Sequence, residues 1–135
     1  MAPSLLDTDT LSDVLKKDDF VRQRSIQYLT EERRFTFSII TRYEILRGLK
    51  AKQADKQIAA FDDLCFASNI LPLTDAIIVK AADIYAYLKR NGILISDADI
   101  LIASTAITHN LVLVTNNVEH FERIDGLKVE SWKEP

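Results

Sequence analysis

The sequence has little cysteine, glycine or proline, and each shortage excludes a class of protein. A single cysteine, Cys65, cannot form an internal disulfide, so a disulfide-stapled scaffold is excluded. Three glycines and three prolines are too few for a collagen-like or low-complexity chain. The remaining composition, 47% hydrophobic and 27% charged, is that of a folded globular protein. Cys65 has helical spacing with Phe61 and Leu64, which favours a buried structural thiol.

Long apolar runs are also absent. Stretches such as 100–103 and 111–114 are far shorter than the ~20 residues that cross a bilayer, so no membrane span is predicted. The chain reaches Asp7 without a basic segment, so we expect no secretory signal and a cytoplasmic location. A length of 135 residues without internal repeats or linkers predicts a single domain over 1–135.

The charge is nearly balanced overall but unevenly distributed. Seventeen basic and 20 acidic residues give a net charge of -3, which argues against a protein that coats nucleic acid. The segment 33–56 nevertheless carries a net charge of +5, and the rest of the chain carries -8. This segment is either a face for a polyanion or an ordinary solvated helix surface. Its basic residues are Arg33, Arg34, Arg42, Arg47, Lys50, Lys52 and Lys56.

Apolar periodicity and capping residues predict alternating strands and helices. Strands are expected at 5–6, 35–39, 70–73, 111–115 and near 129. Helices are expected at 10–17, 20–30, 41–50, 57–66, 76–90, from the Ser96 cap to about 109, and 118–121. Pro72 suits the end of an edge strand, and the helices at 41–50 and 57–66 should form a hairpin. The alternation predicts an α/β three-layer sandwich with a mostly parallel central sheet.

Acidic residues and one amide gather where such a sheet binds ligands. Asp7, Asp9 and Asn117 follow predicted strands, whose carboxyl ends form the binding edge of an open parallel sheet. Glu44 lies in the first turn after the second strand, and Asp99 opens a helix. If the three carboxylates converge, their repulsion and lost hydration require protons or a cation. Hard oxygen ligands favour Mg²⁺ or Mn²⁺ over zinc.

Each acid also has a purely structural explanation. Asp7 and Asp9 can cap the first helix, and Glu44 can form an ion pair with Arg47. Asp97 and Asp99 can complement the dipole of the helix that they open. They lie about 200° apart on that helix, so only one of them can face a shared metal.

Four segments together resemble a known family. Leu5–Asp9, Tyr43–Gly48, Asp99–Ala103 and Val114–Asn117, the last followed by His120 and Phe121, resemble the ordered motifs of PIN-domain ribonucleases. The resemblance covers essentially the whole chain and is closest to the VapC-type toxins of toxin–antitoxin pairs. Two positions depart from the usual pattern. Asp9 stands where the family often has Asn, and Asn117 stands where it often has Asp.

The resemblance implies a PIN-like fold and metal-dependent hydrolysis of RNA phosphodiester bonds, leaving a 5′-phosphate and a 3′-hydroxyl. Asp7, Glu44 and Asp99 would bind Mg²⁺, for which Mn²⁺ can substitute, directly or through water. Asn117 would orient the ion or its water. The family register selects Asp99 over Asp97 as the ligand.

The same resemblance implies protein partners. A homodimer is expected, together with an antitoxin segment that covers the acidic groove. Phe61 and Leu64 would be docking candidates if exposed, although burial in the core is expected of both. His109 at a helix end and His120 before Phe121 receive no catalytic role.

Two other interpretations stay open on the sequence alone. Asp7-Thr8-Asp9-Thr10 also fits the DxDxT phrase of haloacid-dehalogenase-like phosphotransferases, with Asp7 as nucleophile and Asp9 as acid/base. The chain is short for that fold and lacks a convincing glycine-rich acidic motif near its end. Alternatively, the protein is a catalytically inactive α/β binding module whose acids are caps and surface groups.

Overall fold

Five short parallel strands form the central sheet of the structure, a computed structural model that describes residues 1–133. Their order across the sheet is β3-β2-β1-β4-β5, and every neighbouring pair is parallel. The predicted α/β class with a parallel sheet is confirmed. The strands are β1 (Ser4–Leu6), β2 (Thr36–Ser38), β3 (Asn69–Leu71), β4 (Val112–Val114) and β5 (Val129–Glu130). The helices within 1–133 are α1 (Thr8–Leu15), α2 (Asp19–Glu32), α3 (Ile39–Ala51), α4 (Asp55–Phe66), α5 (Asp75–Arg90), α6 (Asp97–Thr108) and α7 (Val118–Phe121).

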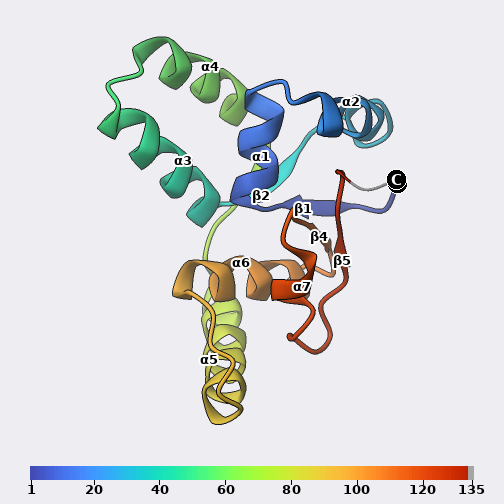
Figure 1. Cartoon of the computed structure of the whole chain (residues 1–135), viewed down its shortest axis with the longest axis vertical. Helices are drawn as coiled ribbons and strands as arrows, with labels where there is room; N and C mark the ends of the chain where they lie inside the picture. The colour runs from blue at the N-terminus through green and yellow to red at the C-terminus, as the bar shows by residue number, and fades with distance from the viewer. Residues whose placement is uncertain (134–135) are drawn as a thin grey trace.

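Helices cover both faces of this sheet (Figure 1). Successive strand residues point to opposite faces, so Leu5 and Leu113 join one core while Leu6 and Val114 join the other. The first core lies under α5, α6 and α7, and the second lies under α1 to α4. The molecule therefore has the three layers that the alternation of strands and helices predicts.

Side-chain caps explain where several helices begin. The Asp7 carboxylate accepts the N–H of Thr10 at 2.8 Å, so α1 begins at Thr8, two residues before the predicted start. Ser38 accepts the N–H of Ile40 at 3.0 Å, so α3 begins at Ile39 and the predicted second strand is shorter. Glu44 therefore lies in the second turn of α3 and not in the first turn, where the sequence predicted it. The predicted hairpin of α3 and α4 is present (Figure 1).

The edge strand and the apolar residues of α4 agree with expectation. β3 lies at the edge of the sheet and ends directly before Pro72. Cys65 is buried, as a structural thiol should be, and Arg42 donates a hydrogen bond to its sulfur at 3.0 Å. Phe61 is completely buried, so it is core and not a docking residue. Leu64 packs against the same core with part of its side chain exposed.

No helix within residues 1–133 combines the length and the apolar character that crossing a membrane requires.

Candidate active site

Asp7 is the most buried acid at the carboxyl edge of the sheet. It follows β1 directly, its N–H donates to the Val114 carbonyl at 3.0 Å, and only 5% of the residue is exposed. Burial raises the pKa of the Asp7 carboxyl from 3.8 to about 6, and hydrogen bonds from Thr115 and Thr10 oppose this rise. The predicted capping role is confirmed, but capping does not require such burial. The site therefore holds a carboxylate whose negative charge is poorly compensated.

Glu44 reaches the residue next to Asp7. Its Oε1 accepts a hydrogen bond from Thr8 Oγ1 at 2.6 Å. The predicted pair with Arg47 is also present, but there the Nη2 to Oε2 distance is 3.7 Å and the Arg47 side chain is 58% exposed. Solvent weakens that pair, so the contact with Thr8 fixes the Glu44 carboxylate. The second acid thus lies beside the start of α1.

Asp99 is paired with a histidine that sequence reasoning left out of the site. Ser96 Oγ accepts the N–H of Asp99 at 3.2 Å, which is the predicted cap. The Asp99 Oδ2 lies 3.0 Å from His120 Nε2, and both side chains are partly exposed. His120 does lie in the predicted helical turn before Phe121, and its ring packs edge-on against Phe121. Asp97, by contrast, is exposed, and the structure gives its carboxylate no capping role.

Asn117 lies at the start of α7, three residues after the end of β4, which pairs with β1. Its backbone N–H donates to Thr115 Oγ1 at 3.0 Å, while its exposed side chain makes no capping hydrogen bond. Thr115 is completely buried and also hydrogen-bonds the Asp7 carboxyl. Thr115 therefore connects the first acid to the backbone of Asn117. The sequence signal for it is its place at the end of a predicted strand.

The four predicted residues lie at one edge of the sheet, where hydrogen bonds tie two of them, Glu44 and Asp99, to other elements. Thr8 joins Glu44 to the Asp7 end of α1, and His120 joins Asp99 to the turn after Asn117. Across residues 1–133, no group of three His, Cys, Asp or Glu side chains is close enough to hold a metal ion. The common convergence of Asp7, Glu44 and Asp99 therefore stays a prediction. Carboxylate and amide oxygens around a poorly compensated acid are the donor set that Mg²⁺ or Mn²⁺ accepts.

A groove begins at this edge and runs between α1, α3 and α4. Its volume is about 310 Å³, and Thr8 and Glu44 form part of its wall. The rest of its wall includes apolar residues, two lysines and the polar residues of α1 and α4: Leu15, Ile45, Leu49, Lys16, Lys52, Ser12 and Gln57. A side chain that binds in the groove would therefore come close to the second acid.

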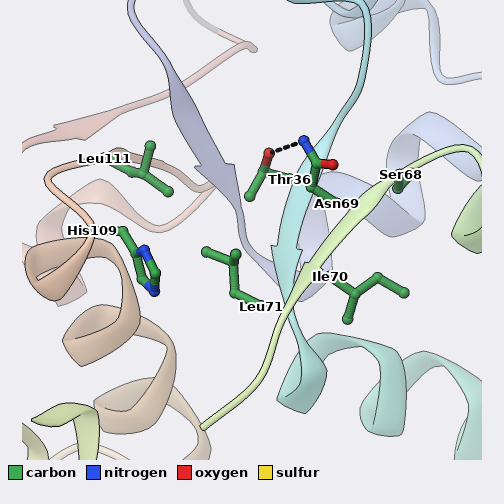
Figure 2. A pocket seen from close by; sticks show the side chains of 7 residues that line it. All are labelled: Thr36, Ser68, Asn69, Ile70, Leu71, His109 and Leu111. Carbon is green, nitrogen blue, oxygen red and sulfur yellow. Dashed lines mark hydrogen bonds between the residues drawn. The ribbon is translucent and has the colours of Figure 1, made fainter. Parts of the chain in front are cut away.

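A larger hollow of about 510 Å³ lies at the opposite edge of the sheet (Figure 2). It is formed where β2 and β3 begin and where α6 ends, with Thr36, Asn69 and His109 among its residues. Asn69 Nδ2 lies 3.4 Å from Thr36 Oγ1, as the dashed line in Figure 2 marks. His109 caps the carboxyl end of α6, as predicted, and belongs to this hollow. None of the candidate acids does.

Comparison with known proteins identifies the family. Residues 4–127 match the PIN domain. The chain therefore belongs to the PIN-domain family. This membership removes the support for the phosphotransferase interpretation of Asp7 and Asp9, which requires a different fold.

Within that family the chain is of the VapC type. It is 38% identical to "Ribonuclease VapC1" of Methanocaldococcus jannaschii, over 93% of this chain and 85% of that protein. It is 30% identical to "tRNA(fMet)-specific endonuclease VapC" of Salmonella typhimurium, over 98% of this chain and 99% of that protein. In DNA-bound VapBC from Salmonella typhimurium, a chain superimposes with a TM-score of 0.86 and 30% identity, over 98% of this chain and 99% of that one.

Proposed function

We propose that this protein is a metal-dependent ribonuclease that hydrolyses RNA phosphodiester bonds and acts as the toxin of a toxin–antitoxin pair. The observation that carries the proposal is the buried Asp7 carboxyl at the carboxyl edge of the sheet, whose pKa is raised to about 6 by burial. Glu44, the second acid, is hydrogen-bonded to Thr8, the residue that follows Asp7. The relatives of the chain include proteins named as VapC ribonucleases, which supports the same proposal.

Asp7, Glu44 and Asp99 are the residues that would hold Mg²⁺ or Mn²⁺, with Asn117 orienting the ion or its water. Such an ion, when bound, lowers the pKa of a water and neutralises charge that develops on phosphate oxygens. The surrounding side chains set the orientation of each acid. Thr8 fixes one oxygen of Glu44, and His120 fixes one oxygen of Asp99. Glu44 and Asp99 are partly exposed, which suits them to accept a proton from an attacking water.

Basic residues around the acids supply the contacts that RNA phosphates need. Lys16 and Lys52 line the groove that contains Glu44, and Arg47 lies one helical turn beyond it. Such cations bind phosphates without reading sequence, so they would give affinity and not choice of RNA. Arg42 is less available because it lies 3.6 Å from Asp62 and its guanidinium lies over the Phe61 ring.

An antitoxin is the proposed partner for the groove. Its apolar wall and its two lysines fit a segment that combines apolar and acidic side chains. The structural relatives include VapBC complexes, which supports a partner of this kind. A homodimer is proposed as well, because α5 exposes the apolar or aromatic residues Ile78, Val79, Tyr85 and Tyr87. A strictly monomeric protein in sedimentation would contradict the dimer.

The test of the nuclease proposal compares two neighbouring acids. Asp99→Asn keeps the shape of the side chain but removes a charge, so RNA cleavage in Mn²⁺ should fall at least tenfold while the fold survives. Asp97→Asn is the matched control, because Asp97 opens the same helix but is exposed. Cleavage of labelled RNA and thermal melting are measured for both variants.

The outcomes separate the alternatives. Loss of cleavage in Asp97→Asn with normal cleavage in Asp99→Asn would show that Asp97, and not Asp99, is the metal ligand. Normal cleavage in both would refute the mechanism. A parent protein that binds no Mn²⁺ and cleaves no RNA would favour an inactive binding module.

A further inference from the structure

A carboxylate outside the predicted site holds the loop that carries Asn117. Asp13 lies in α1, and its Oδ2 accepts a hydrogen bond from Asn116 Nδ2 at 2.7 Å. The same oxygen lies 3.2 Å from Lys133 Nζ, and the Asp13 side chain is only 16% exposed. One atom therefore connects α1, the turn after β4 and the end of the described chain.

The Asn116 side-chain amide has a single hydrogen-bond partner among the described residues. Its Oδ1 is buried and has no hydrogen-bond partner among residues 1–133, so Asp13 is the partner that orients this side chain. A bond to a carboxylate is stronger than a bond between neutral groups. The 2.7 Å contact with Asp13 therefore anchors the middle of the turn.

The turn has a second anchor on α1. Thr115 hydrogen-bonds the Asp7 carboxyl at the start of the helix, and it accepts the backbone N–H of Asn117. Asp13 holds the next residue, Asn116, from a position six residues further along α1. The two anchors together restrain the turn from Thr115 to Asn117 relative to α1.

This restraint matters because Asn117 does not orient itself. Its exposed side chain makes no capping hydrogen bond, so the backbone of the turn is what fixes the place from which this side chain extends. We propose that Asp13 is a positioning residue: through Asn116 it sets the direction in which Asn117 faces the acids of the site. The proposal rests on the proposed function, because it assigns Asn117 to the metal-dependent site.

The experiment removes the bond from either side. Asp13→Ala and Asn116→Ala should each weaken Mn²⁺ binding and lower kcat by about tenfold, the size typical of lost support behind a metal ligand. KM for RNA should change little, because neither residue lines the groove that contains Lys16 and Lys52. Mn²⁺ affinity is measured by calorimetry on the full chain, and kcat and KM are measured with a labelled RNA.

Three controls separate positioning from general stability. Asp13→Asn keeps an oxygen that can accept the Asn116 N–H, so it should restore most of the Mn²⁺ affinity and kcat. Lys133→Ala removes the other partner of Asp13 and should leave both quantities unchanged. The double variant Asp13→Ala/Asn116→Ala should be no worse than either single variant, because both remove one interaction.

Several results would overturn the proposal. Wild-type Mn²⁺ affinity and kcat in Asn116→Ala would do so, and this variant also replaces Asp13→Ala if the latter does not fold. Equal losses in Asp13→Asn and Asp13→Ala would assign the effect to charge instead of to the hydrogen bond. If the parent binds Mn²⁺ without cleaving RNA, the nuclease proposal fails. The Mn²⁺ affinities of the variants then still decide whether Asp13 is a positioning residue. A parent that binds no Mn²⁺ overturns the positioning role as well.

Discussion

At the scale of single residues, the burial of Asp7 makes stability depend on pH. Its pKa is raised from 3.8 to about 6 mainly by desolvation, so the folded state binds the proton more tightly than the unfolded state. Stability therefore decreases as pH rises through the window from about 4 to 6, and the whole penalty is present above it. The rise of the Asp7 pKa from 3.8 to about 6 corresponds to a penalty of at most about 3 kcal/mol.

Asp7→Asn should remove this penalty. The amide still accepts the N–H of Thr10, so the cap of α1 survives and the variant should be more stable by about 1 to 3 kcal/mol at pH 8. At pH 4 the gain should nearly disappear, because the parent carboxyl is then mostly protonated. Urea unfolding at the two pH values measures the difference. Asp9→Asn is the control, since Asp9 is exposed, and a gain that is equal at both pH values would contradict the argument.

Asn117→Asp tests the amide of the proposed site. The substitution adds a negative charge beside the acids, so Mn²⁺ affinity should increase several-fold while RNA cleavage is retained. Asn116→Asp is the matched control one residue earlier. It would place a second carboxylate at the 2.7 Å contact with Asp13, so it should destabilise the fold without tightening Mn²⁺ binding. Calorimetry and thermal melting distinguish the two variants, and unchanged affinity in Asn117→Asp would remove Asn117 from the site.

Local signals predicted some side-chain roles well and missed others. The caps Asp18, Thr74 and Ser96 accept backbone N–H groups two or three residues ahead, within reach of sequence reasoning. The partners of the acids are remote. Thr8 and Glu44 are 36 positions apart, and Asp99 and His120 are 21 apart. Such contacts depend on helix packing and on rotamers, which no local pattern specifies.

At the scale of elements, the start of α6 affects both stability and the site. Ser96→Ala removes the acceptor of the Asp99 N–H and should cost about 1 kcal/mol of stability. Thr74→Ala removes the corresponding cap of α5, whose first turn carries no candidate residue, and should cost a similar amount. Only Ser96→Ala should also lower RNA cleavage, because it loosens the turn that holds Asp99. Equal cleavage by the two variants at equal loss of stability would contradict this coupling.

Element types followed from the sequence because periodicity and capping are local properties. The long apolar stripe of α5 and the cap of α6 placed those helices within one or two residues. Boundaries moved where a polar side chain competed for the backbone, as Ser38 does at the end of β2. The order of the strands is a property of long-range pairing. Three-residue strands such as β1 carry too little pattern to specify which neighbour they join.

At the scale of the whole molecule, basic side chains lie close to the groove beside Glu44. The basic segment 33–56 covers α3 and reaches the start of α4, on the same side of the sheet as the groove beside Glu44. A net charge of -3 does not prevent local attraction of a polyanion, because Lys16 and Lys52 line the groove itself. The same two cations would attract an acidic segment of a protein partner. RNA and antitoxin are thus expected to compete for one surface.

Metal binding should be visible in the stability of the entire fold. An ion that binds the folded chain and not the unfolded one adds about 2.7 kcal/mol at one hundred times its Kd. For a chain of this size that should raise Tm by roughly 5 to 10 °C in excess Mn²⁺ relative to EDTA. The acids of the described chain do not form a ready-made metal cluster, so this net gain includes the cost of moving their side chains together. Asp99→Asn should lose most of the Tm shift, whereas Asp97→Asn should keep it because Asp97 is exposed. Equal melting of the parent in Mn²⁺ and in EDTA would mean that Asp7, Glu44 and Asp99 do not converge on an ion.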